Sequence, residues 1–80
     1  MKTNAIAVNQ RTTEYEQLGT LTDVQACSYW NVLQFRARAG TVLIDPESVT
    51  TRHTAIMDDL LTRRGIQHRA GAIIKKIVRV

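Results

Sequence analysis

The chain has 80 residues, of which 44% are hydrophobic, and a formal net charge of +4 at pH 7. This length supports one hydrophobic core, so we expect a single domain over residues 1–80. Its aliphatic content argues against wholesale disorder, and no segment has the roughly 20 apolar residues that a membrane-spanning helix needs.

Cysteine usage and the first residues indicate the compartment. The lone Cys27 cannot form an intrachain disulfide, and no Cys/His cluster has the spacing of a zinc site, so we expect no metal and no cofactor. Residues 1–10 lack the apolar stretch of a secretory signal. We therefore expect a reducing, cytoplasmic location, and because a core this small is marginally stable, we also expect oligomerisation, with a homodimer as the simplest form.

The N-terminal region predicts little regular structure. Residues 4–8 fit a short strand, and they fit a frayed end equally well. Thr13 and Glu16 have the spacing of a capping box, which predicts a minor helix over residues 14–18.

A first main helix is predicted over residues 23–39. Thr22 and Gln25 form a second capping box, and apolar residues follow at helical spacing. An alternative remains open, because residues 33–38 also alternate between apolar and polar side chains as a strand would. Residues 41–44 favour β structure under either interpretation, so we expect a short strand there.

A second main helix is predicted over residues 46–64. Asp45 is a favoured N-cap, proline suits the first helical position, and Gly65 can end the helix. His53 falls within the apolar stripe of this helix, where we expect a hydrogen-bonded histidine at the edge of the core rather than a metal ligand.

The last residues combine β-favouring side chains with positive charge. Residues 72–79 are rich in isoleucine and valine, which predicts a strand, although Ala70, Ile73, Ile74, Ile77 and Val78 also have helical spacing. With the two helices, the minor helix and two or three short strands, the chain is predicted to be a small α+β domain with a basic C-terminal strand.

The distribution of charge is the most informative functional signal. Residues 60–80 contain no acidic side chain and six cations, which are Arg63, Arg64, Arg69, Lys75, Lys76 and Arg79. Such a cluster can neutralise the phosphates of a nucleic acid. It is equally typical of a solvated face, or of charges that protect an edge strand from aggregation.

A helix-turn-helix arrangement would be one way to use these charges, with either main helix entering the groove of DNA. Base contacts could then come from the first helix, through Gln25, Asn31, Gln34 and Arg38. RNA recognition would need aromatic side chains on a sheet, and Tyr15, Tyr29 and Trp30 do not lie on a convincing strand. We expect Trp30 and its aromatic neighbours to belong mainly to the core.

No motif indicates an enzyme. Asp58 and Asp59 are adjacent on a helix and so point in different directions, and no nucleophile turn, phosphate-binding glycine loop or paired-histidine zinc motif is present. We expect a small non-enzymatic regulatory protein that binds nucleic acid, DNA rather than RNA, through its basic C-terminal region. The alternative is a protein-binding module, such as an inhibitor, adaptor or self-assembling subunit, that uses an apolar surface or a strand edge or docks on an acidic protein.

Overall fold

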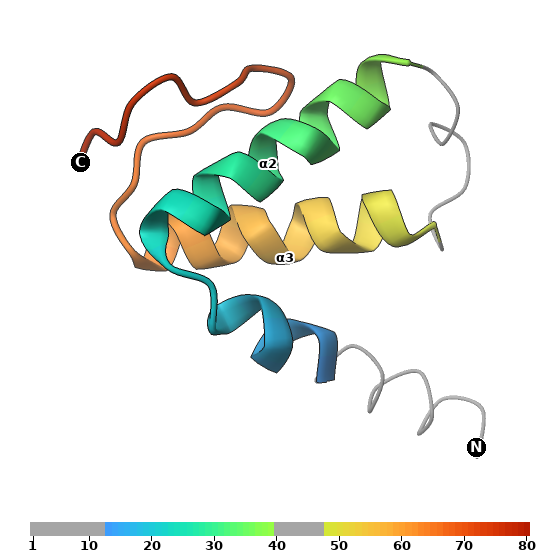
Figure 1. Cartoon of the computed structure of the whole chain (residues 1–80), viewed down its shortest axis with the longest axis horizontal. Coiled ribbons are helices and arrows are strands. Elements are labelled where there is room, and N and C mark those ends of the chain that lie inside the picture. The colour runs from blue at the N-terminus through green and yellow to red at the C-terminus, as the bar shows by residue number, and fades with distance from the viewer. Residues whose placement is uncertain (1–12, 40–47) are drawn as a thin grey trace.

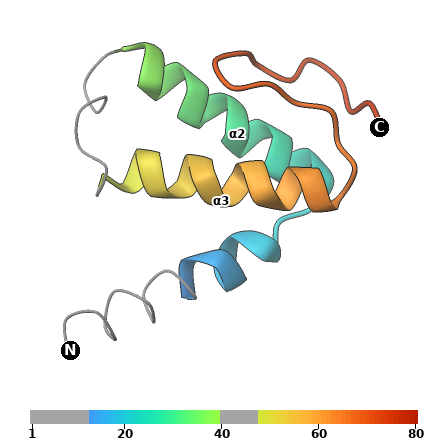
Figure 2. The ribbon, with the colours of Figure 1, turned by 180° about the vertical axis from the view of Figure 1, so that it is seen from behind.

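A computed structural model describes residues 13–39 and 48–80, and within these ranges the fold is helical (Figure 1). Residues 13–19 form a short helix, followed by α2 (Asp23–Arg38) and α3 (Val49–Arg63). α2 and α3 lie side by side, with the short helix next to α3 and the C-terminal segment along α2 (Figure 1; Figure 2). No helix in the described ranges is long and apolar enough to cross a membrane.

Local signals predicted α2 well. The Thr22 hydroxyl accepts from Gln25 N at 3.1 Å, and the Gln25 side chain accepts from Thr22 N at 2.9 Å, so the predicted capping box is confirmed. The strand alternative for residues 33–38 is wrong, because these residues belong to α2. The predicted minor helix is also confirmed, and extends over residues 13–19.

α3 begins later than predicted. Its N-cap is Ser48, whose hydroxyl accepts from Thr51 N at 3.1 Å, so the first helical residue is Val49 rather than residue 46. Asp45 and Pro46 lie outside the described residues. The predicted stop is confirmed, because Gly65 follows the helix with a φ of +71°, a left-handed conformation that glycine adopts readily.

The α+β fold class is wrong, because the described residues contain three helices and no strand. The predicted strand at 72–79 is an irregular segment whose backbone pairs at one isolated antiparallel bridge, between Ile66 and Arg79. Its β-favouring residues lack a neighbouring strand, and side chains of α2 bind its backbone instead. The predicted strands at 4–8 and 41–44 lie outside the described residues.

The core lies between α2, α3 and the start of the C-terminal segment. Its fully buried members include Trp30 and Leu33 of α2, Met57 and Leu61 of α3, and Ile66. The expectation that Trp30 belongs to the core is confirmed. Phe35 is 74% exposed, so the expectation fails for that residue.

Candidate nucleic-acid interface

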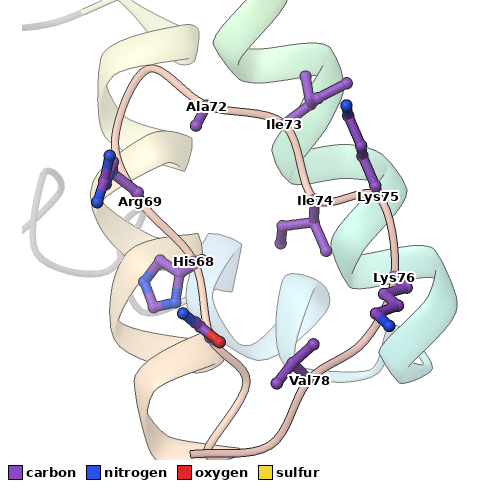
Figure 3. A pocket seen from close by; sticks show the side chains of 9 residues that line it. His68, Arg69, Ala72, Ile73, Ile74, Lys75, Lys76 and Val78 are labelled. Carbon is purple, nitrogen blue, oxygen red and sulfur yellow. The ribbon is translucent and has the colours of Figure 1, made fainter.

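Residues 67–78 of the C-terminal segment form an irregular loop that packs against α2. We call this segment the basic loop. It borders a hollow of about 450 Å³, the loop hollow (Figure 3). Figure 3 shows Arg69 on one side of this hollow and Lys75 and Lys76 on the other. Ala72, Ile74 and Val78 supply apolar lining between them.

Polar side chains of α2 hold the backbone of the basic loop. Asn31 makes two hydrogen bonds to Ile74, and Trp30 Nε1 donates to Ala72 O at 3.0 Å. Gly71 N donates to Gln34 Oε1 at 2.7 Å, and Arg38 donates to Gly71 O at 2.6 Å. An irregular segment satisfies its backbone in this way without joining a sheet.

His68 anchors the basic loop from its inner side. Its ring contacts Trp30 edge-on, with 5.1 Å between the ring centroids, and its Nε2 lies 2.6 Å from Asp58 Oδ1. The side chain is only 9% exposed. The sequence around His68 does not indicate that it anchors the loop, because its partners Trp30 and Asp58 belong to other segments of the chain.

Three of the six predicted cations are available to a ligand. Arg69, Lys75 and Lys76 are exposed. Within residues 13–39 and 48–80, none of the three makes an ion pair. Arg38 adds a fourth positive charge at the turn of the loop, through its bond to Gly71 O.

The other three predicted cations are held in ion pairs. Arg64 and Arg79 both contact the carboxylate of Asp23, and Arg79 also donates to Arg64 O at 2.7 Å. Arg63 binds Asp59 at 2.8 Å, one turn away on α3. These three cations share two carboxylates, so the predicted cluster separates into a half held in ion pairs and a half without them.

The Asp23 carboxylate joins the start of α2 to the end of the described chain. The hydrogen bond from Arg79 is the largest influence on its pKa, which lies below its ordinary value despite some desolvation. Its position in the first turn of α2 also suits the positive end of the helix dipole. Asp23 therefore stays ionised and contributes to folding through its ion pairs with Arg64 and Arg79.

The side chains predicted to read bases have structural roles. Gln25 completes the α2 capping box, Asn31 and Gln34 bind the basic loop, and Arg38 bonds to Gly71 O. The connection from α2 to α3 spans residues 39–48, whereas a helix-turn-helix has a turn of three or four residues. α2 and α3 are therefore not joined as a helix-turn-helix, whereas residues 20–22 form a turn of that length between the short helix and α2.

A second polar cluster joins the short helix to the main pair. His53 is bonded to Glu14 and Tyr29, as expected for a hydrogen-bonded histidine at the edge of the core. Partial burial would raise the pKa of Glu14, but bonds from Arg52 and His53 outweigh it and lower that pKa. The pKa of Tyr29 is raised by burial, which keeps its hydroxyl neutral.

The part of the chain that the structure describes holds neither a metal-binding cluster nor an activated thiol. There, no three side chains of the His, Cys, Asp and Glu types gather as a metal site would require. Cys27 is buried, and burial raises its thiol pKa, which disfavours the reactive thiolate.

No protein-family model matches the sequence, and no curated protein and no solved structure is significantly similar to it. Function must therefore be inferred from the residues and their geometry.

Proposed function

We propose that this protein binds nucleic acid, duplex DNA first among its forms, by placing the phosphate backbone against the basic loop. The observation that carries this proposal is the group of exposed and unpaired cations Arg69, Lys75 and Lys76 around one hollow. Lysine and arginine attract phosphates and release their counterions, which drives sequence-independent binding.

The distribution of acidic groups supports the same proposal. The carboxylates of Glu14, Asp23 and Asp59 are each engaged with a cation or a hydroxyl outside the basic loop, and the Asp58 carboxylate is engaged with His68 of the loop. The basic loop itself contains no acidic residue. The three loop cations outnumber the one carboxylate that reaches the loop, so a polyanion can approach them without displacing an ion pair of Arg69, Lys75 or Lys76.

Base readout is not part of the proposal, because the polar side chains of α2 that could reach bases are bonded to the protein itself. We infer that binding is largely indifferent to sequence. With three phosphate contacts, the logarithm of the association constant should fall against the logarithm of salt concentration with a slope of roughly −2.7.

Fluorescence anisotropy of labelled duplex DNA at several salt concentrations tests the proposal. The variants Arg69→Gln, Lys75→Gln and Lys76→Gln should each weaken binding to unrelated sequences about equally and reduce the slope by about 1. Arg63→Gln is the matched control, because it removes the same charge from a cation that is already paired with Asp59.

Three outcomes would contradict the proposal. The first is that the protein does not bind DNA at low salt. The second is that Arg63→Gln loses binding while the loop variants keep it. The third is that polyaspartate binds as tightly as DNA. The last outcome would identify an acidic protein as the partner. Labelled single-stranded DNA and RNA, measured in parallel, rank the forms of nucleic acid.

A second candidate function is self-association through α2. Val24, Val32 and Phe35 form an exposed apolar stripe along this helix, and Val24 and Phe35 are 67% and 74% exposed. Exposed apolar stripes are typical of protein interfaces. The strand-edge form of this alternative has no strand to use in residues 13–39 and 48–80.

Sedimentation velocity over a range of concentrations tests the second candidate. We expect the wild-type protein to be a dimer and the Phe35→Ser variant to be a monomer. The dimerisation constant should depend little on salt. A monomeric wild type at the highest concentration would exclude it, whatever the outcome of the DNA experiments.

A further inference from the structure

Phe35 is the largest apolar side chain that the described residues expose to solvent. Its exposed fraction is 74%, although the sequence predicts that it belongs to the core. A single exposed apolar residue is ordinary on a protein surface, so its surroundings decide whether it has a function. Those surroundings are positively charged.

Phe35 lies on the side of α2 that holds the basic loop. Asn31, four residues before it, donates to Ile74 O at 2.9 Å, and Arg38, three residues after it, donates to Gly71 O at 2.6 Å. Residues three and four positions apart lie on the same side of a helix. Phe35 is therefore placed beside the basic loop, between two points at which the loop is attached to α2.

Two arginines of the last turn of α2 flank Phe35. Each residue of an α-helix is turned by about 100° from the one before it, so Arg36 and Arg38 lie on opposite sides of Phe35 around the helix. Both are exposed. Within residues 13–39 and 48–80, neither makes an ion pair. After Asp23 in its first turn, α2 contains no acidic residue, so Phe35 is bordered on both sides by positive charge.

An apolar ring between two cations matches DNA better than it matches a second copy of the chain. Proteins that bind the minor groove use arginine and lysine to hold the DNA, and they frequently insert an apolar side chain such as phenylalanine between base pairs. A symmetric pair of chains centred on Phe35 would instead bring Arg36 and Arg38 close to the same two arginines of the second copy. Like charges in an interface oppose association. The charge around the ring therefore favours a polyanion with flat bases.

We propose that Phe35 inserts between two neighbouring base pairs of the bound duplex, while Arg36 and Arg38 contact phosphates of the two DNA strands. This inference rests on the proposed function, in which the basic loop supplies the electrostatic attraction. Insertion contacts the faces of the bases and not their edges, so it reads no sequence. It requires local unstacking of the duplex, which costs least where bases are already mismatched. The protein therefore selects weakly stacked sites.

Two duplexes of one sequence, one fully paired and one with a single central mismatch, test the inference by fluorescence anisotropy. The wild-type protein should bind the mismatched duplex more tightly, because less unstacking is needed. Phe35→Ala should abolish this preference and weaken binding to the mismatched duplex at least about fivefold, the lower end of the loss that removing one stacked aromatic ring causes. Its salt slope should be unchanged, since no charge is removed. Phe35→Trp keeps an aromatic ring and should retain the preference.

Val49→Ala is the matched control, because it removes an exposed apolar side chain from α3 and should leave both affinities unchanged. Since Phe35 is itself exposed, its substitutions should leave the fold intact. Equal affinity of the wild type for the two duplexes, or a preference that survives in Phe35→Ala, would overturn the inference while the proposed function stands. Failure of the wild type to bind either duplex at low salt would overturn both.

Sedimentation velocity of the complexes separates insertion from self-association. Insertion predicts that Phe35→Ala lowers the affinity without changing the number of protein copies on each duplex. A drop from two copies to one in Phe35→Ala would place Phe35 between two copies of the chain, and the inference would then be wrong.

Discussion

Asn31 of α2 satisfies both backbone polar groups of Ile74, 43 residues further along the chain. Its Nδ2 donates to Ile74 O at 2.9 Å, and its Oδ1 accepts from Ile74 N at 2.6 Å. These are the two hydrogen bonds that a neighbouring strand would have supplied. One amide side chain thus helps to fix the basic loop, and with it the two lysines that follow Ile74.

Replacing Asn31 should loosen the basic loop. Asn31→Leu removes both partners of Ile74 and leaves two backbone groups unsatisfied, so we expect a loss of about 1–3 kcal/mol in the free energy of unfolding. Hydrogen exchange at the Ile74 amide should also accelerate. Urea unfolding and exchange NMR measure the two effects, with Ser28→Ala, an exposed position on the same helix, as the control. Equal urea midpoints for the two variants would show that the contact contributes nothing.

The helices were predictable because their signals are local. The Thr22 capping box, the apolar spacing through Trp30 and the stop at Gly65 each involve residues within a few positions of one another. The error at the start of α3 is also local, because Ser48 serves as N-cap three residues after the stronger-looking Asp45. Local preference ranks such sites without deciding between them.

The C-terminal strand was mispredicted because its fate depends on distant residues. Isoleucine and valine favour a strand only where a neighbouring strand is available. Here Trp30, Asn31 and Gln34 bind the backbone instead, and nothing within residues 72–79 encodes that. The sequence of α2 does contain a sign of this binding, because its polar side chains lie on one helical face beside the core. The same pattern, however, also fits base contacts.

Counting charges identified the region of the candidate interface but not its members. The sequence shows six cations and no acid over residues 60–80, yet Asp23 engages Arg64 and Arg79 from 41 and 56 positions away. Pairing of this kind follows from the packing of α2 against α3. Arg69, Lys75 and Lys76, which make no ion pair within the described residues, could therefore be distinguished from the other three cations only in three dimensions.

Acid should destabilise the protein through Asp23. The pKa of Asp23 in the folded state lies below its ordinary value of 3.8. Between these two pKa values the unfolded chain binds the proton more readily, so the free energy of unfolding falls as pH falls. We expect the urea midpoint to decline below about pH 5 and to keep declining through the lowered pKa. Asp23→Asn should flatten this decline, and Glu16→Gln, which removes an exposed carboxylate of the short helix, is the control. An unchanged pH profile in Asp23→Asn would show that its ion pairs do not form in solution.

Gly71 should be required for its backbone conformation rather than for its size. Its φ is +82°, and a Cβ added there would meet nothing within 4 Å, so Gly71→Ala tests backbone strain alone. We expect a loss of about 1–2 kcal/mol. Gly19→Ala is the matched comparison, because its φ is ordinary and its nearest neighbour is Leu60 Cδ2 at 4.0 Å; it should be neutral or stabilise by about 0.4–1 kcal/mol. Thermal unfolding of both variants measures the difference, and a neutral Gly71→Ala would rule out the left-handed turn.

Leu61 and Phe35 are both large apolar residues on main helices, and the structure predicts opposite consequences for their removal. Leu61 is fully buried against Trp30 and its neighbours in the core, so Leu61→Ala should cost about 2–5 kcal/mol and could unfold a domain this small. Phe35 is mostly exposed, so Phe35→Ala should change the free energy of unfolding of the monomer by no more than about 0.5 kcal/mol. Urea unfolding at low protein concentration measures both. A large loss in Phe35→Ala under those conditions would contradict this placement of α2, whereas a loss that grows with protein concentration would show that a second copy of the chain covers Phe35.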